Sequence, residues 1–187
     1  MKRKKVIALI TATLTFTMTV CGSLTAAAAS ELTAESKPAT QYTIDANQEV
    51  YALLDFEDTA ELENATKGLV ASLDTLDIYD DNGKLVWSQT AYAFLDQDAP
   101  DTANPSLWRD TQLNHIYGLF EVTDGIYQVR GYDMSNITFI KGDTGWIVVD
   151  PLMSVECAQA ALALVEENLG TFPVKAVIYS HSHVDHF

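Results

Sequence analysis

The segment that most constrains the fold contains a strand, a helix and a second strand in succession. Residues 146–149, Trp-Ile-Val-Val, are apolar without alternation, which predicts a strand covered on both faces. Ser154 is suited to cap a helix that Gly170 ends, and residues 174–179 form a second apolar run. This order predicts an α/β fold. The expected buried face of the helix consists of Val155, Ala158, Leu162, Val165 and Leu169.

A dense group of metal-binding side chains follows the second strand directly. Residues 181–186 read His-Ser-His-Val-Asp-His. Neutral imidazole is a good zinc donor, and a carboxylate oxygen completes a borderline-hard site. His181 and His183 are two positions apart, so an extended loop projects them to the same side. Asp185 and His186 are adjacent and must diverge. The spacing therefore favours two metal ions, one held by the first two histidines and one by the Asp-His pair.

Each of these half-sites is incomplete. Catalytic zinc sites usually have about three protein ligands and keep one position for water. The chain before the loop offers only one other histidine, His115, which we interpret as a surface or packed residue. The missing ligands are therefore expected beyond Phe187. The alternative is a solvated, histidine-rich loop without a metal.

The amino terminus has the pattern of a secretory signal peptide over residues 1–29. Four basic residues come first, a mostly apolar stretch at 6–20 follows, and alanines at 26–29 suit cleavage. The apolar stretch is shorter than the ~20 residues that a membrane span needs, so we expect no stable span. The sequence therefore predicts a secreted or periplasmic protein.

Cleavage of that segment would leave seven basic and 26 acidic residues, and hence a net charge of −19. Such a charge repels phosphate backbones, so we expect no nucleic-acid partner. An anionic substrate stays compatible, because bound metal ions can dominate the field of a site. Cleavage would also leave Cys157 as the only cysteine, which predicts a small core residue and no internal disulfide.

The chain before residue 116 is less regular. Residues 30–47 are polar and predict a flexible lead-in. Residues 76–79 and 84–87 alternate polar and apolar around an Asn-Gly pair, which predicts a β-hairpin. Helical character is expected at residues 57–67 and 107–113, and further strands at 125–130 and 136–140.

The histidine loop resembles the metal motif of the metallo-β-lactamase superfamily, with His181, His183, Asp185 and His186 at the ligand positions. This resemblance implies an αβ/βα sandwich with a one- or two-zinc site between its halves. Asp150 matches the upstream aspartate of the superfamily, which usually fixes the metal loop through hydrogen bonds. On the residues alone, a turn-forming Asp-Pro is an equally good interpretation.

A longer stretch, from about residue 56 to residue 187, resembles the amino-terminal half of secreted bacterial alkyl sulfatases, the linear alkyl-sulfate hydrolases of this superfamily. Among the runs that carry it are Asn-Pro-Ser-Leu-Trp-Arg at 104–109 and Gly-Ile-Tyr-Gln-Val-Arg-Gly at 125–131. The resemblance implies two zinc ions, hydrolysis of alkyl sulfates such as dodecyl sulfate to alcohol and sulfate, and a homodimer. It also implies a carboxy-terminal region with a dimerisation segment and a lipid-carrier-like domain, which these 187 residues do not contain.

With this resemblance we expect a signal peptide at 1–29, a flexible lead-in at 30–47, a family-specific extension at 48–115 and a truncated metallo-β-lactamase-like domain at 116–187. That domain would be the first half of the sandwich. Two alternatives to alkyl sulfate hydrolysis stay open. One is another hydrolase of the superfamily, acting on a lactam, thioester, lactone or phosphodiester. The other is an inactive secreted chain, if 187 residues are the whole protein. We expect the chain on its own to be inactive and aggregation-prone.

Overall fold

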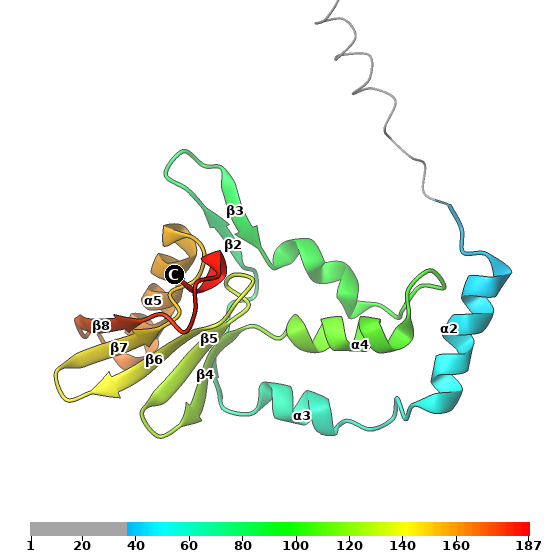
Figure 1. The fold of residues 1–187 in the computed structure, drawn as a ribbon, viewed down its shortest axis with the longest axis horizontal. Coiled ribbons are helices and arrows are strands. Elements are labelled where there is room, and N and C mark those ends of the chain that lie inside the picture. Colours follow the sequence, from blue (N-terminus) through cyan, green and yellow to red (C-terminus); the bar gives the residue numbers. More distant parts are fainter. Residues whose placement is uncertain (1–36) are drawn as a thin grey trace, which may run out of the picture. The chain divides into compact units, whose positions relative to one another are not determined.

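The structure, a computed structural model that describes residues 37–187, contains a six-stranded sheet (Figure 1). Its strand order is β1-β4-β5-β6-β7-β8, antiparallel up to β7, whereas β7 and β8 are parallel. The predicted α/β class is therefore confirmed. The strands span Leu69–Ala71 (β1), Gly118–Thr123 (β4), Ile126–Arg130 (β5), Ile137–Gly142 (β6), Gly145–Val149 (β7) and Val174–Ile178 (β8).

The core lies between one face of this sheet and helix α5, Val155–Leu169, which connects β7 to β8. Trp146 and Val148 of β7 point into this core and are 0% and 4% exposed. Ile147 and Val149 alternate to the other face and are only half-buried. The prediction that β7 is covered on both faces is therefore wrong, because the described residues cover the second face less completely.

Helix α5 begins and ends where its caps predict, but its most buried stripe is shifted from the predicted one. The Ser154 hydroxyl accepts the Cys157 N–H at 3.1 Å, and Gly170 follows the last turn with a φ of 92°. The residues buried in the core are Cys157, Ala161, Leu164 and Val165, whereas Val155 is 63% exposed. The predicted face is confirmed at Val165 and in part at Leu162 and Leu169, which are partly buried against the core, and it is wrong at Val155. The helix has two adjoining apolar stripes, and periodicity alone does not choose between them.

The chain before β4 forms helices and a hairpin. The predicted hairpin is confirmed as β2, Asp77–Tyr79, and β3, Leu85–Ser88, and both predicted helices are present. The Trp87 indole N–H donates to the Gly131 carbonyl at 2.8 Å, which ties the hairpin to the end of β5. The helical elements are α2 (Gln41–Leu53), α3 (Ala60–Thr66), the 3₁₀ helix η1 (Thr90–Asp96) and α4 (Pro105–Asn114).

The flexible lead-in predicted at 30–47 is wrong from Gln41 onward, because α2 begins there. The Thr40 hydroxyl caps this helix by accepting the Thr43 N–H at 3.3 Å. The Asn47 amide donates to the Asp101 carbonyl at 2.8 Å and fastens α2 to a distant loop. These polar contacts stabilise a helix that buries none of its residues.

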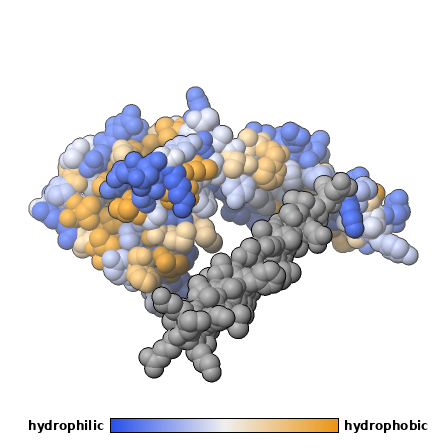
Figure 2. Space-filling model, turned by 90° about the horizontal axis from the view of Figure 1, so that it is seen from above, coloured by the Kyte–Doolittle hydropathy of each residue, from blue (hydrophilic) through white to orange (hydrophobic). Residues whose placement is uncertain are grey.

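Ala39–Phe187 form one compact unit, and the division expected at residue 116 stays a prediction. The signal peptide expected at 1–29 lies outside the described residues. Among the helices of residues 37–187, none has the length and apolar character needed to cross a membrane. In space-filling view, apolar patches stand between polar ones on the part of the unit that holds the sheet (Figure 2).

Candidate metal centre

The histidine loop starts directly after β8, at the carboxyl end of the parallel strand pair. Figure 1 shows it beside the carboxyl terminus, and it ends in a short 3₁₀ turn, η2, at Val184–His186. His181 and His183 are exposed, whereas Asp185 and His186 are half-buried. Ligand sites of α/β proteins commonly lie at such strand ends.

Asp150 holds this loop from the end of β7. Asp150 is 9% exposed, and its carboxylate accepts three hydrogen bonds: from the Ser180 N–H at 2.7 Å, the Ser180 hydroxyl at 2.6 Å and His186 Nδ1 at 2.9 Å. Its backbone has a φ of 55°, in the left-handed region that aspartate tolerates better than most residues. Asp150 is therefore both the turn residue and the anchor of the loop, so the two interpretations of the sequence are compatible.

These contacts set the charge of Asp150. Burial by itself would raise the pKa of this carboxyl group. Hydrogen bonds from the Ser180 side chain and backbone and from His186 outweigh that effect and lower the pKa from 3.8 to about 2. Asp150 is therefore an anion at neutral pH, and it accepts rather than donates in all three bonds.

The same contacts determine which imidazole nitrogens carry hydrogen. The Ser180 hydroxyl has one hydrogen, which it gives to Asp150, so its oxygen accepts from His181 Nδ1 at 2.9 Å. His186 Nδ1 likewise donates to Asp150. In their neutral forms, both rings therefore carry a lone pair on Nε2, the arrangement that a metal-binding histidine needs.

The donor atoms meet in two pairs, which are the pairs that the spacing predicts. His181 Nε2 lies 3.0 Å from His183 Nδ1, and His186 Nε2 lies 3.1 Å from Asp185 Oδ2. Two ligands of one tetrahedral zinc ion are separated by roughly 3.3 Å, given bonds of ~2.0–2.1 Å. Lone pairs this close repel each other unless a cation or proton lies between them. The donor set therefore fits metal ions, although residues 37–187 bring no three such groups together around one point.

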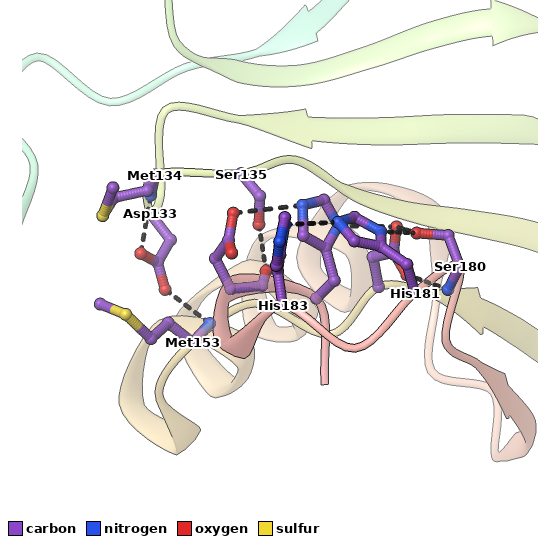
Figure 3. Close-up of polar contacts among 10 residues, drawn as sticks. Asp133, Met134, Ser135, Met153, Ser180, His181 and His183 are labelled. Carbon is purple, nitrogen blue, oxygen red and sulfur yellow. Dashed lines mark hydrogen bonds and ion pairs between the residues drawn. The ribbon is translucent and has the colours of Figure 1, made fainter.

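Two residues that support the loop were missed by the sequence analysis (Figure 3). Ser180 directly precedes His181, and its position beside the motif was the available signal. Ser135 lies between β5 and β6 and donates its hydroxyl hydrogen to the Asp185 carbonyl, 50 positions away. No local pattern marks such a contact. His115 lies outside the site, at the end of α4, with Nδ1 2.8 Å from Gln89 Oε1, which agrees with its interpretation as a packed residue.

The chain has relatives of known activity. Over 154 residues it is 49% identical to a linear primary-alkylsulfatase of Pseudomonas sp, with 81% of this chain and 23% of that protein covered. It is 49% identical to an (R)-specific secondary-alkylsulfatase of Pseudomonas sp, with 82% and 23% covered. A third relative is alkyl/aryl-sulfatase BDS1 of Saccharomyces cerevisiae, 47% identical over 146 residues, with 78% and 23% covered.

A solved structure has the same fold. The structure of the stereoselective inverting sec-alkylsulfatase Pisa1 from Pseudomonas sp matches with a TM-score of 0.78 and 49% identity, over 82% of this chain and 24% of that one. The chain thus spans about a quarter of the length of the relatives it matches. Residues 130–187, which include the histidine loop, match the family model of the metallo-beta-lactamase superfamily. The chain is therefore a homologue of the alkylsulfatases over these residues, and its last 58 residues, 130–187, resemble the metallo-β-lactamase superfamily.

Proposed function

We propose that the protein carrying this chain hydrolyses alkyl sulfate esters, such as dodecyl sulfate, to an alcohol and sulfate. The observation that carries the proposal is the 49% identity with two alkylsulfatases over 154 residues. The loop that Asp150 fastens supports it, because it presents the donor pairs that a metal-dependent hydrolase needs. Because the chain covers only 23% of these relatives, the proposal concerns the complete protein.

We propose that the histidine loop binds two zinc ions. His181 and His183 would hold the first ion, and Asp185 and His186 the second. When bound, zinc lowers the pKa of a coordinated water toward ~7 and offsets the negative charge of the sulfate group. The chain itself contributes orientation, because Asp150 accepts from His186 directly and reaches His181 through Ser180.

The relatives do not select one alkyl chain. The primary and the secondary alkylsulfatase are both 49% identical to this chain, so identity gives no preference between their substrates. One relative is described as inverting, and inversion at a carbon centre requires attack on that carbon. Hydrolysis in oxygen-18 water distinguishes the two routes here: attack on carbon labels the alcohol, and attack on sulfur labels the sulfate.

Two further properties belong to this proposal. The complete protein is proposed to be exported to the periplasm or medium, on the strength of the charged, apolar and alanine-rich pattern at residues 1–29. It is also proposed to be a homodimer, as the resemblance to alkyl sulfatases implies. Amino-terminal sequencing of the native protein tests the first property, and light scattering tests the second.

The competing function is another hydrolase reaction of the same superfamily. A panel of dodecyl sulfate, a β-lactam, a thioester, a lactone and a phosphodiester separates the two on the native protein. We expect release of sulfate from dodecyl sulfate and much slower turnover of the other four. Rapid turnover of one of those four, with no sulfate released, would replace the proposed function.

A further inference from the structure

We infer that the loop between β5 and β6 is a second support of the histidine loop, and that Ser135 is a positioning residue for the ion held by Asp185 and His186. The inference rests on the proposed metal-binding role of the loop. Its basis is a chain of contacts that joins three loops, drawn in Figure 3.

The first contact places Ser135 on the backbone of the ligand turn. The Ser135 hydroxyl donates to the carbonyl oxygen of Asp185, in the 3₁₀ turn η2. Within that turn the His186 N–H donates to the His183 carbonyl at 3.0 Å. Three residues of 3₁₀ helix are intrinsically weak. Ser135 therefore fixes the peptide that connects the two proposed ligands of the second ion.

The second contact, made by Asp133, holds the β5–β6 loop in place beside the loop that follows β7. Asp133 is 5% exposed, and its carboxylate accepts the Met134 N–H at 2.6 Å and the Met153 N–H at 2.8 Å. Met153 lies in the loop between β7 and α5, which begins with Asp150. Hydrogen bonds to a buried carboxylate are stronger than neutral ones, so Asp133 joins the loop of Ser135 to the loop of Asp150.

The two supports act on different parts of the histidine loop. Asp150 reaches the imidazole rings of His186 and, through Ser180, His181. Ser135 reaches only the backbone at Asp185. Loss of Asp150 therefore affects both donor pairs, whereas loss of Ser135 affects the Asp185–His186 pair alone. This difference distinguishes a positioning role from a general contribution to folding.

The test is the retention of zinc by the native protein, measured by elemental mass spectrometry after dialysis against graded concentrations of a chelator. The variants are Ser135→Ala, which removes the hydroxyl, and Ser135→Thr, which keeps it. Ser72→Ala is the matched control, because the Ser72 hydroxyl also donates to a backbone carbonyl, that of Tyr117 at 2.9 Å, away from the histidine loop. Thermal unfolding of each variant is measured in parallel.

We expect Ser135→Ala to lose one of two zinc ions at a chelator concentration about tenfold lower than the parent protein requires. This is the range typical for partners that orient metal ligands. The second ion should stay, and Ser135→Thr and Ser72→Ala should behave as the parent protein. Equal retention in Ser135→Ala, parallel loss of both ions, or a parent protein without zinc would each overturn the inference. Because the readout is zinc and not sulfate, it can succeed even where the sulfatase assignment fails.

Discussion

At the scale of single residues, Asp150 connects the end of β7 to both ends of the histidine loop. Its carboxylate accepts two bonds from Ser180 and one from His186. Ser180 itself mediates between Asp150 and His181, so one buried anion orients two imidazole rings. The tautomers of both histidines thus depend on a residue that is not a proposed ligand.

Substitution of Asp150 by asparagine should weaken zinc binding without removing a proposed ligand. The amide keeps the size of the side chain but has one acceptor oxygen in place of two, and its NH₂ group faces donors. We expect the zinc affinity of the native protein to fall about ten- to a hundredfold. Equilibrium dialysis measures it, with Asp81→Asn on the exposed hairpin turn as the control. Unchanged affinity in Asp150→Asn would contradict this account of the loop.

A second prediction concerns Tyr132, which is 1% exposed and whose hydroxyl has no hydrogen-bond partner among the described residues. Burial, together with the nearby charges of Tyr117 and Glu167, raises the pKa of Tyr132 from 10.0 to about 12. The pKa of Tyr132 is higher in the folded than in the unfolded chain, so the folded state holds the phenolic proton more tightly. The contribution of neutral Tyr132 to the free energy of unfolding is therefore fully present below pH 10 and is lost as the pH rises from 10 toward 12.

Tyr132→Phe should remove this part of the pH dependence, since it has no proton to lose. Between pH 8 and pH 11 the free energy of unfolding should fall in both chains. We expect the fall to be larger in the parent chain than in Tyr132→Phe, by on the order of 1 kcal/mol. Urea unfolding at both pH values measures the difference. Tyr42→Phe, at a position 89% exposed, is the control and should follow the parent. Parallel curves for the parent chain and Tyr132→Phe would exclude this cause.

At the scale of elements, the signals that predict this fold are local ones. An Asn-Gly turn predicts the hairpin of β2 and β3, and a serine cap predicts α5, because each requires only neighbouring residues. Helix α2 escapes prediction, since the amide of Asn47 bonds Asp101, 54 positions away. The four proposed ligands and Asp150 are identifiable from their spacing and the resemblance, whereas the support from Ser135 is visible only in three dimensions.

The parallel pairing of β7 with β8 depends on a glycine. A Cβ at Gly145, which has a φ of +155°, would lie 2.1 Å from the Pro173 carbonyl oxygen. That oxygen accepts the Trp146 N–H at 2.9 Å, at the start of the pairing. Gly125 is the matched control, because it also has a positive φ, +74°, but a Cβ there would meet no atom within 4 Å.

We expect Gly125→Ala to lower the free energy of unfolding by about 1–2 kcal/mol, from backbone strain alone. Gly145→Ala should cost clearly more, because the clash is with backbone and separates β8 from β7. Urea unfolding of both variants measures the two costs. Equal costs would mean that the close approach of Pro173 does not constrain this pairing.

At the scale of the whole molecule, β8 lies at the edge of the sheet and is exposed along its length. Val174, Val177 and Ile178 are 42%, 44% and 49% exposed. An exposed apolar edge strand offers unpaired backbone groups and apolar side chains to other chains. This surface also adjoins the histidine loop, so association at β8 and order in the loop are expected to be linked.

The 187-residue chain on its own should therefore associate as its concentration rises. A lysine on the edge strand opposes such pairing, so Val177→Lys should shift the chain toward monomer. Val122→Lys places the same charge at a position 54% exposed on β4, an inner strand, and should have little effect. Light scattering over a concentration series gives the result. A parent chain that stays monomeric at every concentration would show that the exposed edge at β8 does not drive association.

The most direct test of the central claim is sulfate release from dodecyl sulfate by the native protein, before chelation, after chelation and after zinc is restored. The parent protein should release sulfate, lose that activity on chelation and regain it with zinc. His183→Ala should not regain it, because one proposed ligand of the first ion is gone. Sulfate release that survives chelation, or that His183→Ala retains in full, would contradict a metal centre at the histidine loop. A zinc-loaded protein that releases no sulfate would contradict the proposed reaction.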